Sequence, residues 1–197
     1  MTMRIIAGTA RGRRIFTTPK DIMVRPISGR IRQQLFDIIR PLVTGSYFLD
    51  LFAGTGAVGL EALSRGAQKA VFIEVDNRCL KVIGRNLVHL GFEDRGTALR
   101  GNATNALTWV MHRTNLENFD LIFMGPPYRE ADNTPLFLAR PTLEHISTGK
   151  LLSPHGWIMA QHHQKEEPGV IAGLEMFRRE KHGDSRVSFY RWAKPAV

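Results

Sequence analysis

Residues 47–59 read Tyr-Phe-Leu-Asp-Leu-Phe-Ala-Gly-Thr-Gly-Ala-Val-Gly, and this stretch decides the fold. Its first six residues are apolar or aromatic except for Asp50, which predicts a buried strand. Gly54, Gly56 and Gly59 then follow with the spacing G-x-G-x-x-G. Glycines at this spacing allow a sharp turn from strand to helix and let a ligand approach the helix N-terminus. The stretch therefore predicts a strand, a ligand-binding glycine loop and a helix.

Strands and helices alternate on the C-terminal side of this motif. Apolar runs predict further strands at 69–75, 97–101, 119–124, 156–160, 174–179 and 187–192. Helical spacing of apolar residues predicts helices at 57–65, 78–90, 103–113 and 134–146. The alternation is typical of a mostly parallel α/β sheet, and the short turn before the last strand predicts a closing antiparallel hairpin. We therefore expect a Rossmann-like α/β fold with a seven-stranded sheet.

Basic residues outnumber acidic ones and are concentrated near the N-terminus. The chain has 27 Lys and Arg against 18 Asp and Glu, a formal net charge of +9. Residues 1–40 contain nine basic and two acidic residues, so +7 of that charge lies in this segment. A basic segment attached to a nearly neutral body is typical of a nucleic-acid-binding arm. The alternative is a solvated basic surface that has no partner.

The basic segment also carries structural signals of its own. Short apolar runs at 3–7 and 13–16 predict a small hairpin. Ser28 is a good N-cap residue, and the apolar spacing after it predicts a helix that ends near residue 40. We expect an N-terminal arm over 1–40 and a main domain over 41–197. The arginines expected to contact nucleic acid are Arg4, Arg11, Arg13, Arg14, Arg25, Arg30 and Arg32.

Composition argues against several other classes of protein. Cys79 is the single cysteine, so an internal disulfide is impossible, and no Cys/His cluster has the spacing of a zinc site. No apolar run approaches the ~18 residues of a membrane span, and the N-terminus becomes basic too early for a signal peptide. We expect a cytoplasmic monomer that needs no metal and no membrane.

An acidic residue follows the glycine loop at an informative distance. Glu74 ends the next predicted strand, 20 residues after Gly54, where a carboxylate can accept hydrogen bonds from ribose hydroxyls. Too little chain remains after the fourth strand for the substrate domain of a dehydrogenase. S-adenosylmethionine has no phosphate, and Asp50 is placed to attract its ammonium group. The sequence therefore favours S-adenosylmethionine over a dinucleotide as the cofactor.

A second candidate site follows the predicted strand at 119–124. Gly125, Pro126, Pro127 and Tyr128 lie at its carboxyl end, where open α/β sheets bind their ligands. The loop is similar to the [Asp/Asn]-Pro-Pro-[Tyr/Phe] motif of amino methyltransferases, which act on exocyclic nitrogens. Acceptor groups at such a loop would orient the amine, and the aromatic ring would stack on an extruded base. We take these four residues as candidate catalytic residues.

The chain resembles the RsmD family, bacterial methyltransferases of guanine N2 in small-subunit (16S) ribosomal RNA. The resemblance rests on the segments MRIIAG at 3–8, RP at 25–26, RIR at 30–32, DLFAGTG at 50–56, GLEALSRGA at 59–67, GDS at 183–185 and VSFY at 187–190. It implies the fold of a class I S-adenosylmethionine methyltransferase. It also implies that the partner is small-subunit rRNA or its assembling particle. The cofactor-binding residues expected on this basis are Asp50, Phe52, Gly54, Thr55, Gly56, Glu74 and Asn102.

The chain departs from the family pattern at two positions of the expected site. Asn102 stands where the family usually has an aspartate, and an amide can still contact adenine. Gly125 stands where the family usually has Asp or Asn, which removes the side-chain acceptor from the catalytic loop. Three hypotheses follow: a guanine-N2 rRNA methyltransferase, a degenerate protein that binds cofactor and RNA with weak or no turnover, or an amino methyltransferase acting on DNA.

Overall fold

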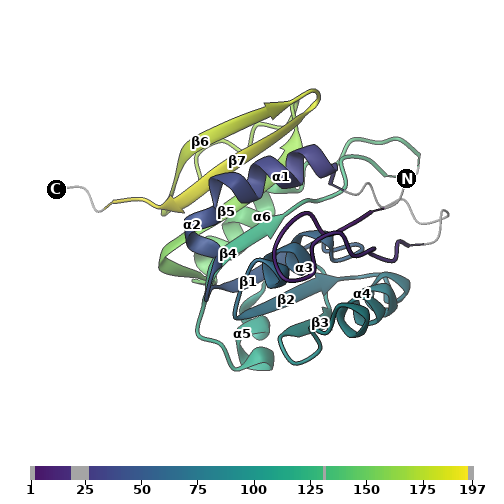
Figure 1. The fold of residues 1–197 in the computed structure, drawn as a ribbon. Helices are drawn as coiled ribbons and strands as arrows, with labels where there is room; N and C mark the ends of the chain where they lie inside the picture. The colour runs from purple at the N-terminus through teal and green to yellow at the C-terminus, as the bar shows by residue number, and fades with distance from the viewer. Residues whose placement is uncertain (1–2, 19–26, 131, 195–197) are drawn as a thin grey trace. The chain divides into compact units, whose positions relative to one another are not determined.

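The computed structural model describes residues 3–18, 27–130 and 132–194 (Figure 1). The chain divides into two compact units, Met1–Asn102 and Ala103–Val197. Each unit contains parallel strands and the helices that follow them. Together the described residues form seven strands, mostly parallel, with an antiparallel hairpin at the end of the second unit. This confirms the Rossmann-like α/β fold that the sequence predicts.

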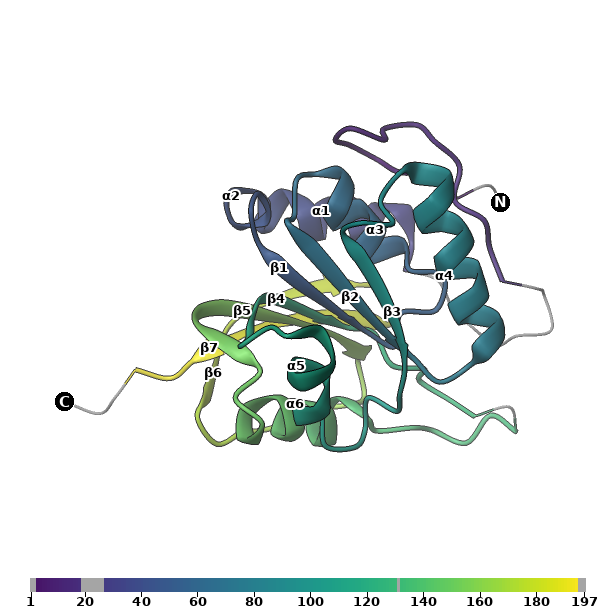
Figure 2. The ribbon, with the colours of Figure 1, turned by 90° about the horizontal axis from the view of Figure 1, so that it is seen from below.

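The first unit is built on three parallel strands in the order β3-β2-β1. These strands are β1 (Tyr47–Leu51), β2 (Lys69–Glu74) and β3 (Gly96–Arg100). Helix α3 (Ala57–Ser64) packs on β1 and β2, and α4 (Asn77–Leu90) packs on β2 and β3 (Figure 2). Every residue of α3 is buried, because the helix is apolar on nearly all sides.

The N-terminal residues form the predicted hairpin and helix. Arg4 and Arg14 make an antiparallel bridge, and the Ile5 N–H donates to the Arg13 carbonyl at 3.0 Å. Helix α1 (Gly29–Ile38) begins after Ser28, whose hydroxyl accepts a hydrogen bond from the Ile31 N–H at 3.2 Å. The short helix α2 (Arg40–Val43) then leads into β1.

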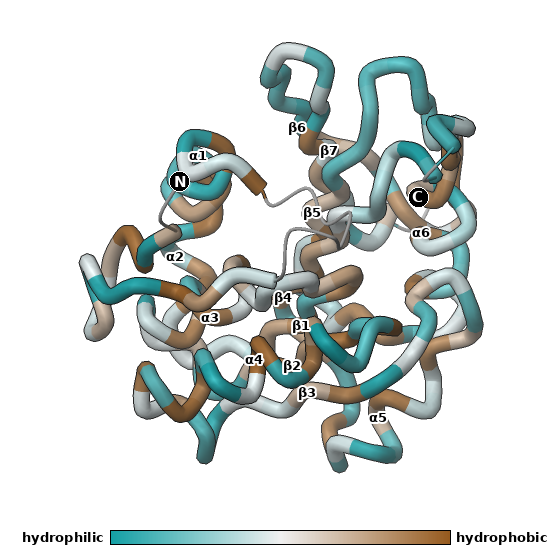
Figure 3. Tube along the Cα trace, turned by 90° about the vertical axis from the view of Figure 1, so that its right-hand side faces the viewer, coloured by the Kyte–Doolittle hydropathy of each residue, from teal (hydrophilic) through white to brown (hydrophobic). Residues whose placement is uncertain are grey.

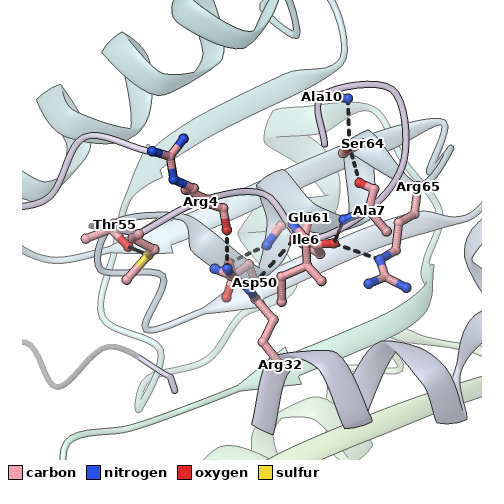
Figure 4. A network of polar contacts seen from close by, with 12 residues as sticks. Arg4, Ile6, Ala7, Ala10, Arg32, Asp50, Thr55, Glu61, Ser64 and Arg65 are labelled. Carbon is pink, nitrogen blue, oxygen red and sulfur yellow. Dashed lines mark hydrogen bonds and ion pairs between the residues drawn. The ribbon is translucent and has the colours of Figure 1, made fainter. Parts of the chain in front are cut away.

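Glu61, a fully buried residue on α3, binds the N-terminal hairpin to that helix (Figure 4). Its two oxygens accept hydrogen bonds from the backbone N–H groups of Ile6, at 2.8 Å, and Ala7, at 2.9 Å. The Arg65 guanidinium donates to the same carboxylate at 2.8 Å, and the Arg32 guanidinium lies 3.7 Å from it. The hairpin is therefore held by a buried charged group on the helix that follows the glycine loop.

The second unit contains four strands in the order β4-β5-β7-β6. They are β4 (Phe119–Met124), β5 (Leu152–His163), β6 (Leu174–His182) and β7 (Ser185–Trp192). β4 and β5 are parallel, whereas β7 runs antiparallel to both β5 and β6. The connection between β6 and β7 is hydrophilic (Figure 3). The helices of this unit are α5 (Thr108–Thr114) and α6 (Ala139–Thr148).

Several predicted boundaries are wrong, including the end of the strand predicted at 174–179, which extends through Leu174–His182. The helix predicted from 134 begins at Ala139, because the preceding loop closes on itself: the Leu136 N–H donates to the Tyr128 carbonyl at 2.9 Å. The helix predicted from 103 begins at Thr108, after turns over the preceding residues. The fifth strand is longer than 156–160 and extends through Leu152–His163, because both of its edges are paired, with β4 and with β7.

Within the described residues, no helix is long and apolar enough to cross a membrane. The same part of the chain contains no group of three or more His, Cys, Asp or Glu side chains that could hold a metal ion.

Candidate functional site

The glycine loop has the backbone conformation that its sequence predicts. Gly54 and Gly56 have φ angles of 55° and 77°, in the left-handed region that side chains disfavour. Gly59 is required for a different reason: a Cβ atom there would lie 2.3 Å from the ring of Phe72 on β2. The third glycine of the motif thus lets α3 pack closely against the strand.

Glu74 lies directly beside this loop. Its Oε2 accepts a hydrogen bond from the Gly54 N–H at 2.8 Å. Its Oε1 accepts from the N–H groups of Val75 and Asp76 at 2.8 and 3.0 Å. A carboxylate has about four acceptor positions, so one remains after these three bonds. A second ribose hydroxyl would have to displace one of the backbone donors.

Asp50 is 1% exposed at the end of β1. Its Oδ2 accepts a hydrogen bond from the Gly59 N–H at 2.9 Å. Burial raises the pKa of Asp50 to about 8; the charge of Glu74 acts in the same direction and the Gly59 hydrogen bond acts against it. A carboxyl group with this pKa is protonated over much of the neutral range, and a nearby cation would favour its ionised form.

The remaining candidate cofactor residues of the first unit differ in exposure. Phe52 directly follows β1 with a φ of 58°, an unusual conformation for an aromatic residue, and is half-buried. Thr55 is buried, and its carbonyl accepts a hydrogen bond from the Asn86 side chain at 3.2 Å. Asn102 is exposed, two residues after β3. The structure thus leaves Asn102 open to solvent, whereas Thr55 can offer a ligand little of its side chain.

Most of the candidate RNA-binding arginines lie at the surface of the first unit. Arg4, Arg11, Arg14 and Arg30 are exposed. The exposed Arg13 donates hydrogen bonds to the carbonyls of the last turn of α4, those of His89 and Leu90. Arg13 therefore has a structural role in addition to its charge. Arg25 lies outside the described residues.

Arg32 is the exception among these arginines, because it is 2% exposed. Its guanidinium donates to the Arg4 carbonyl and lies beside Glu61. Burial lowers the pKa of Arg32, and the charge of Glu61 opposes that shift. A side chain buried in this way cannot contact a nucleic-acid backbone, so the prediction that Arg32 binds RNA is wrong.

The second unit contains the predicted catalytic loop. Gly125, Pro126, Pro127 and Tyr128 follow β4 directly, with Pro126 buried and Pro127 exposed. The Tyr128 hydroxyl donates a hydrogen bond to Ser185 Oγ and accepts one from Gln161 Nε2, each at 3.0 Å. The rings of His163 and Tyr128 also pack in a T-shaped arrangement, with their centroids 5.6 Å apart. The tyrosine is thus fixed by residues from β5 and β7.

Gln161, His163 and Ser185 were not predicted as site residues. Gln161 and His163 are two residues apart on β5, so their side chains share a face of the sheet. Ser185 pairs with His163 across the antiparallel ladder. The spacing of Gln161 and His163 could be seen in the sequence, but their proximity to Ser185 on the neighbouring strand could not.

Comparison with known proteins assigns the chain to a family. A family model described as "Conserved hypothetical protein 95" matches residues 3–191. The chain belongs to the RsmD family. This RsmD-family chain is 32% identical over 190 residues to YlbH of Bacillus subtilis, covering 96% of this chain and 98% of that protein. It is 31% identical to the ribosomal RNA small subunit methyltransferase D of Escherichia coli, covering 93% of each.

A solved structure supports the same assignment. The Escherichia coli protein yhhF superposes with a TM-score of 0.77 and 29% sequence identity, over 98% of this chain and 100% of that one. The RsmD-family chain therefore has the fold of its relatives over nearly its whole length.

Proposed function

We propose that this RsmD-family protein transfers a methyl group from S-adenosylmethionine to the exocyclic N2 of a guanine in small-subunit rRNA. The observation that carries the proposal is that two carboxylates hold the glycine loop. Glu74 accepts a hydrogen bond from the Gly54 N–H, and the buried Asp50 accepts one from the Gly59 N–H. The name of the Escherichia coli relative, a small-subunit rRNA methyltransferase, supports rRNA as the substrate class.

The acceptor groups of the first unit fit S-adenosylmethionine chemically. Glu74 has acceptor capacity for a ribose hydroxyl, and Asp50 provides a carboxylate for the ammonium group. The exposed Asn102, two residues after β3, is the residue that we expect to contact adenine. When bound, S-adenosylmethionine supplies an electrophilic methyl group on a sulfonium centre. No charged side chain of the glycine loop opposes a cationic ligand.

The reaction needs the target amine to be oriented, because its lone pair is delocalised into the guanine ring. In the proposed step the nitrogen lone pair forms the new C–N bond as the C–S bond breaks, and the electrons of that bond stay on sulfur. The nitrogen then loses one proton to water. Tyr128, fixed through Ser185 and Gln161, provides an aromatic face for the base. The carbonyl of Pro126 is a candidate acceptor for an amine N–H.

Exposed arginines of the first unit supply the proposed RNA-binding surface: Arg4, Arg11, Arg13, Arg14 and Arg30. Their charge attracts phosphates without regard to base sequence. The loop at 125–128 then selects the target guanine.

The test is methyl transfer from S-adenosylmethionine labelled in its methyl group. The acceptors are naked small-subunit rRNA, small-subunit particles lacking the modification, and duplex and single-stranded DNA. Label recovered as N2-methylguanine after nuclease digestion of the RNA would support the proposal. Label in DNA alone would identify a DNA amino methyltransferase. Cofactor and RNA binding without transfer would identify a binding protein and contradict the proposed activity.

A further inference from the structure

The side chain of Gln161 lies next to the position where the catalytic loop lacks a side chain. Gln161 is half-buried on β5, and Gly125 directly follows β4, the parallel neighbour of β5. A Cβ atom built on Gly125 would lie 3.8 Å from Gln161 Oε1, an ordinary van der Waals distance. The amide oxygen therefore borders the space that a side chain at position 125 would enter.

The hydrogen bonds of Tyr128 determine which end of the amide faces Gly125. The Tyr128 hydroxyl donates its single hydrogen to Ser185 Oγ, so it can only accept from Gln161. Gln161 Nε2 makes this bond at 3.0 Å. Among the residues that the structure describes, no group donates a hydrogen bond to Gln161 Oε1. The amide is thus held by its nitrogen, and its oxygen retains its acceptor capacity.

We propose that Gln161 Oε1 accepts a hydrogen bond from the target amine and takes the place of a side-chain acceptor at position 125. The inference rests on the proposed function, because it assigns a group to the same amine. A neutral amide oxygen can orient an N–H and stabilise the positive charge that develops on nitrogen. It takes no proton, so the proton released after C–N bond formation goes to water. Gly125 is then compatible with turnover.

A purely positioning role is the competing explanation. Gln161 could act only by holding Tyr128, and then the loss of its oxygen would not matter. The two roles separate because the first depends on an acceptor near position 125, whereas the second depends on the bond to the Tyr128 hydroxyl. An acceptor restored from position 125 can replace the first role but not the second.

The experiment compares single-turnover methyl transfer to small-subunit rRNA in the parent protein, Gln161→Met, Tyr128→Phe and two double variants. Methionine keeps the length of the side chain and removes both polar ends. We expect Gln161→Met to lower the transfer rate by roughly 100-fold, the effect typical of one lost electrostatic contact, with unchanged cofactor affinity. Adding Gly125→Asn to Gln161→Met should raise the transfer rate at least about ten-fold above that of Gln161→Met alone.

Matched controls make the rescue specific. Gly125→Ala combined with Gln161→Met adds a Cβ without an acceptor and should not restore transfer. Either substitution at 125 requires Phe123 to shift by a few tenths of an ångström, since its ring lies 3.1 Å from the added Cβ, so thermal unfolding is measured for each variant. Gln68→Met, at an exposed glutamine before β2, should leave transfer unchanged.

The outcomes distinguish this inference from the proposed function. Transfer by the parent protein that Gln161→Met leaves intact would overturn the inference and keep the function. Equal losses in Gln161→Met and Tyr128→Phe, with no rescue by Gly125→Asn, would also overturn it, because they indicate positioning alone. An absence of transfer to rRNA by the parent protein, with cofactor still bound, would overturn the function and the inference together.

Discussion

The Glu74 carboxylate accepts a hydrogen bond from the Gly54 N–H at 2.8 Å, which joins the end of β2 to the glycine loop. The two residues are 20 positions apart in the chain, and parallel pairing of β1 with β2 brings them together. The same carboxylate accepts from the backbone of Val75 and Asp76. One side chain thus organises the loop and retains an acceptor position for a ligand.

Replacing Glu74 should weaken cofactor binding. Glu74→Gln keeps one acceptor oxygen but removes the charge, and a hydrogen bond to a charged group contributes about 1.5–3 kcal/mol. We expect the affinity for S-adenosylmethionine to fall by about 10- to 100-fold, as measured by titration calorimetry.

The control for this variant is Glu93→Gln, which removes the same charge from an exposed position after α4. Its affinity should match that of the parent protein. Equal affinity in Glu74→Gln and the parent protein would mean that the ribose lies elsewhere.

The fold and the cofactor loop could be predicted because their signals are local. Apolar runs set the strands, Ser28 marks the start of α1, and the spacing of Gly54, Gly56 and Gly59 marks the turn before α3. Such signals depend on near neighbours in the chain. They were less reliable where a loop competes with a helix, as in the residues before Ala139.

Partners distant in sequence were not predictable in the same way. Arg32 reads as one more basic residue, yet it is buried beside Glu61, 29 positions away. Glu61 reads as a polar residue in an apolar helix, yet it binds the backbone of the hairpin. Gln161 follows the strand predicted at 156–160, yet it donates a hydrogen bond to Tyr128, and its amide oxygen borders the space beside Gly125. In each case the partner is set by packing rather than by local pattern.

Removal of the Glu61 carboxylate should strongly destabilise the protein. Glu61→Ala would leave Arg32 and Arg65 without their counter-charge and two hairpin N–H groups without an acceptor. Loss of one partner from a buried ion pair typically costs about 3–5 kcal/mol. We expect a decrease of this size in the free energy of unfolding by urea. Glu117→Ala, at an exposed glutamate, should change it by less than about 0.5 kcal/mol, and equal changes in the two variants would contradict this role.

The exposed arginines of the first unit should determine the salt dependence of RNA binding. Arg11, Arg14 and Arg30 are exposed, and substituting all three with glutamine removes three positive charges. Each lost phosphate contact should flatten the plot of log K against log salt concentration by roughly 0.7–0.9. Cofactor affinity should not change, because none of the three belongs to the glycine loop.

A charge-matched variant shows whether position matters. Glutamine at Lys69, Arg113 and Lys194 removes the same charge from exposed positions outside residues 1–40. The salt slope of this variant should remain close to that of the parent protein. If the two triple variants flatten the slope equally, RNA binding depends on net charge rather than on the N-terminal segment.

Asp50 should make stability fall as the pH rises. Its pKa is about 8 in the folded protein against an ordinary value of 3.8, so the folded state holds a proton that the unfolded state has released. The contribution of Asp50 to the free energy of unfolding is therefore greatest below about pH 4. It decreases as the pH rises and levels off above about pH 8. Asp50→Asn keeps an oxygen for the Gly59 N–H but cannot ionise, so it should lose less stability over the same interval in urea unfolding.

The same group should release a proton when cofactor binds. In the proposed complex the ammonium of S-adenosylmethionine would favour ionised Asp50 and so lower the pKa of a carboxyl group that is protonated near neutral pH. Calorimetry near pH 7 in buffers with different ionisation enthalpies would measure protons released to the buffer, and Asp50→Asn should release fewer. The comparison also separates Asp50 from Glu74. Glu74→Gln should lower the affinity and still release a proton, although fewer than the parent protein, because the charge of Glu74 helps to raise the pKa of Asp50. Equal proton release by the parent protein and Asp50→Asn would mean that the ammonium group does not contact Asp50. The role of Asp50 would then be limited to packing at the end of β1.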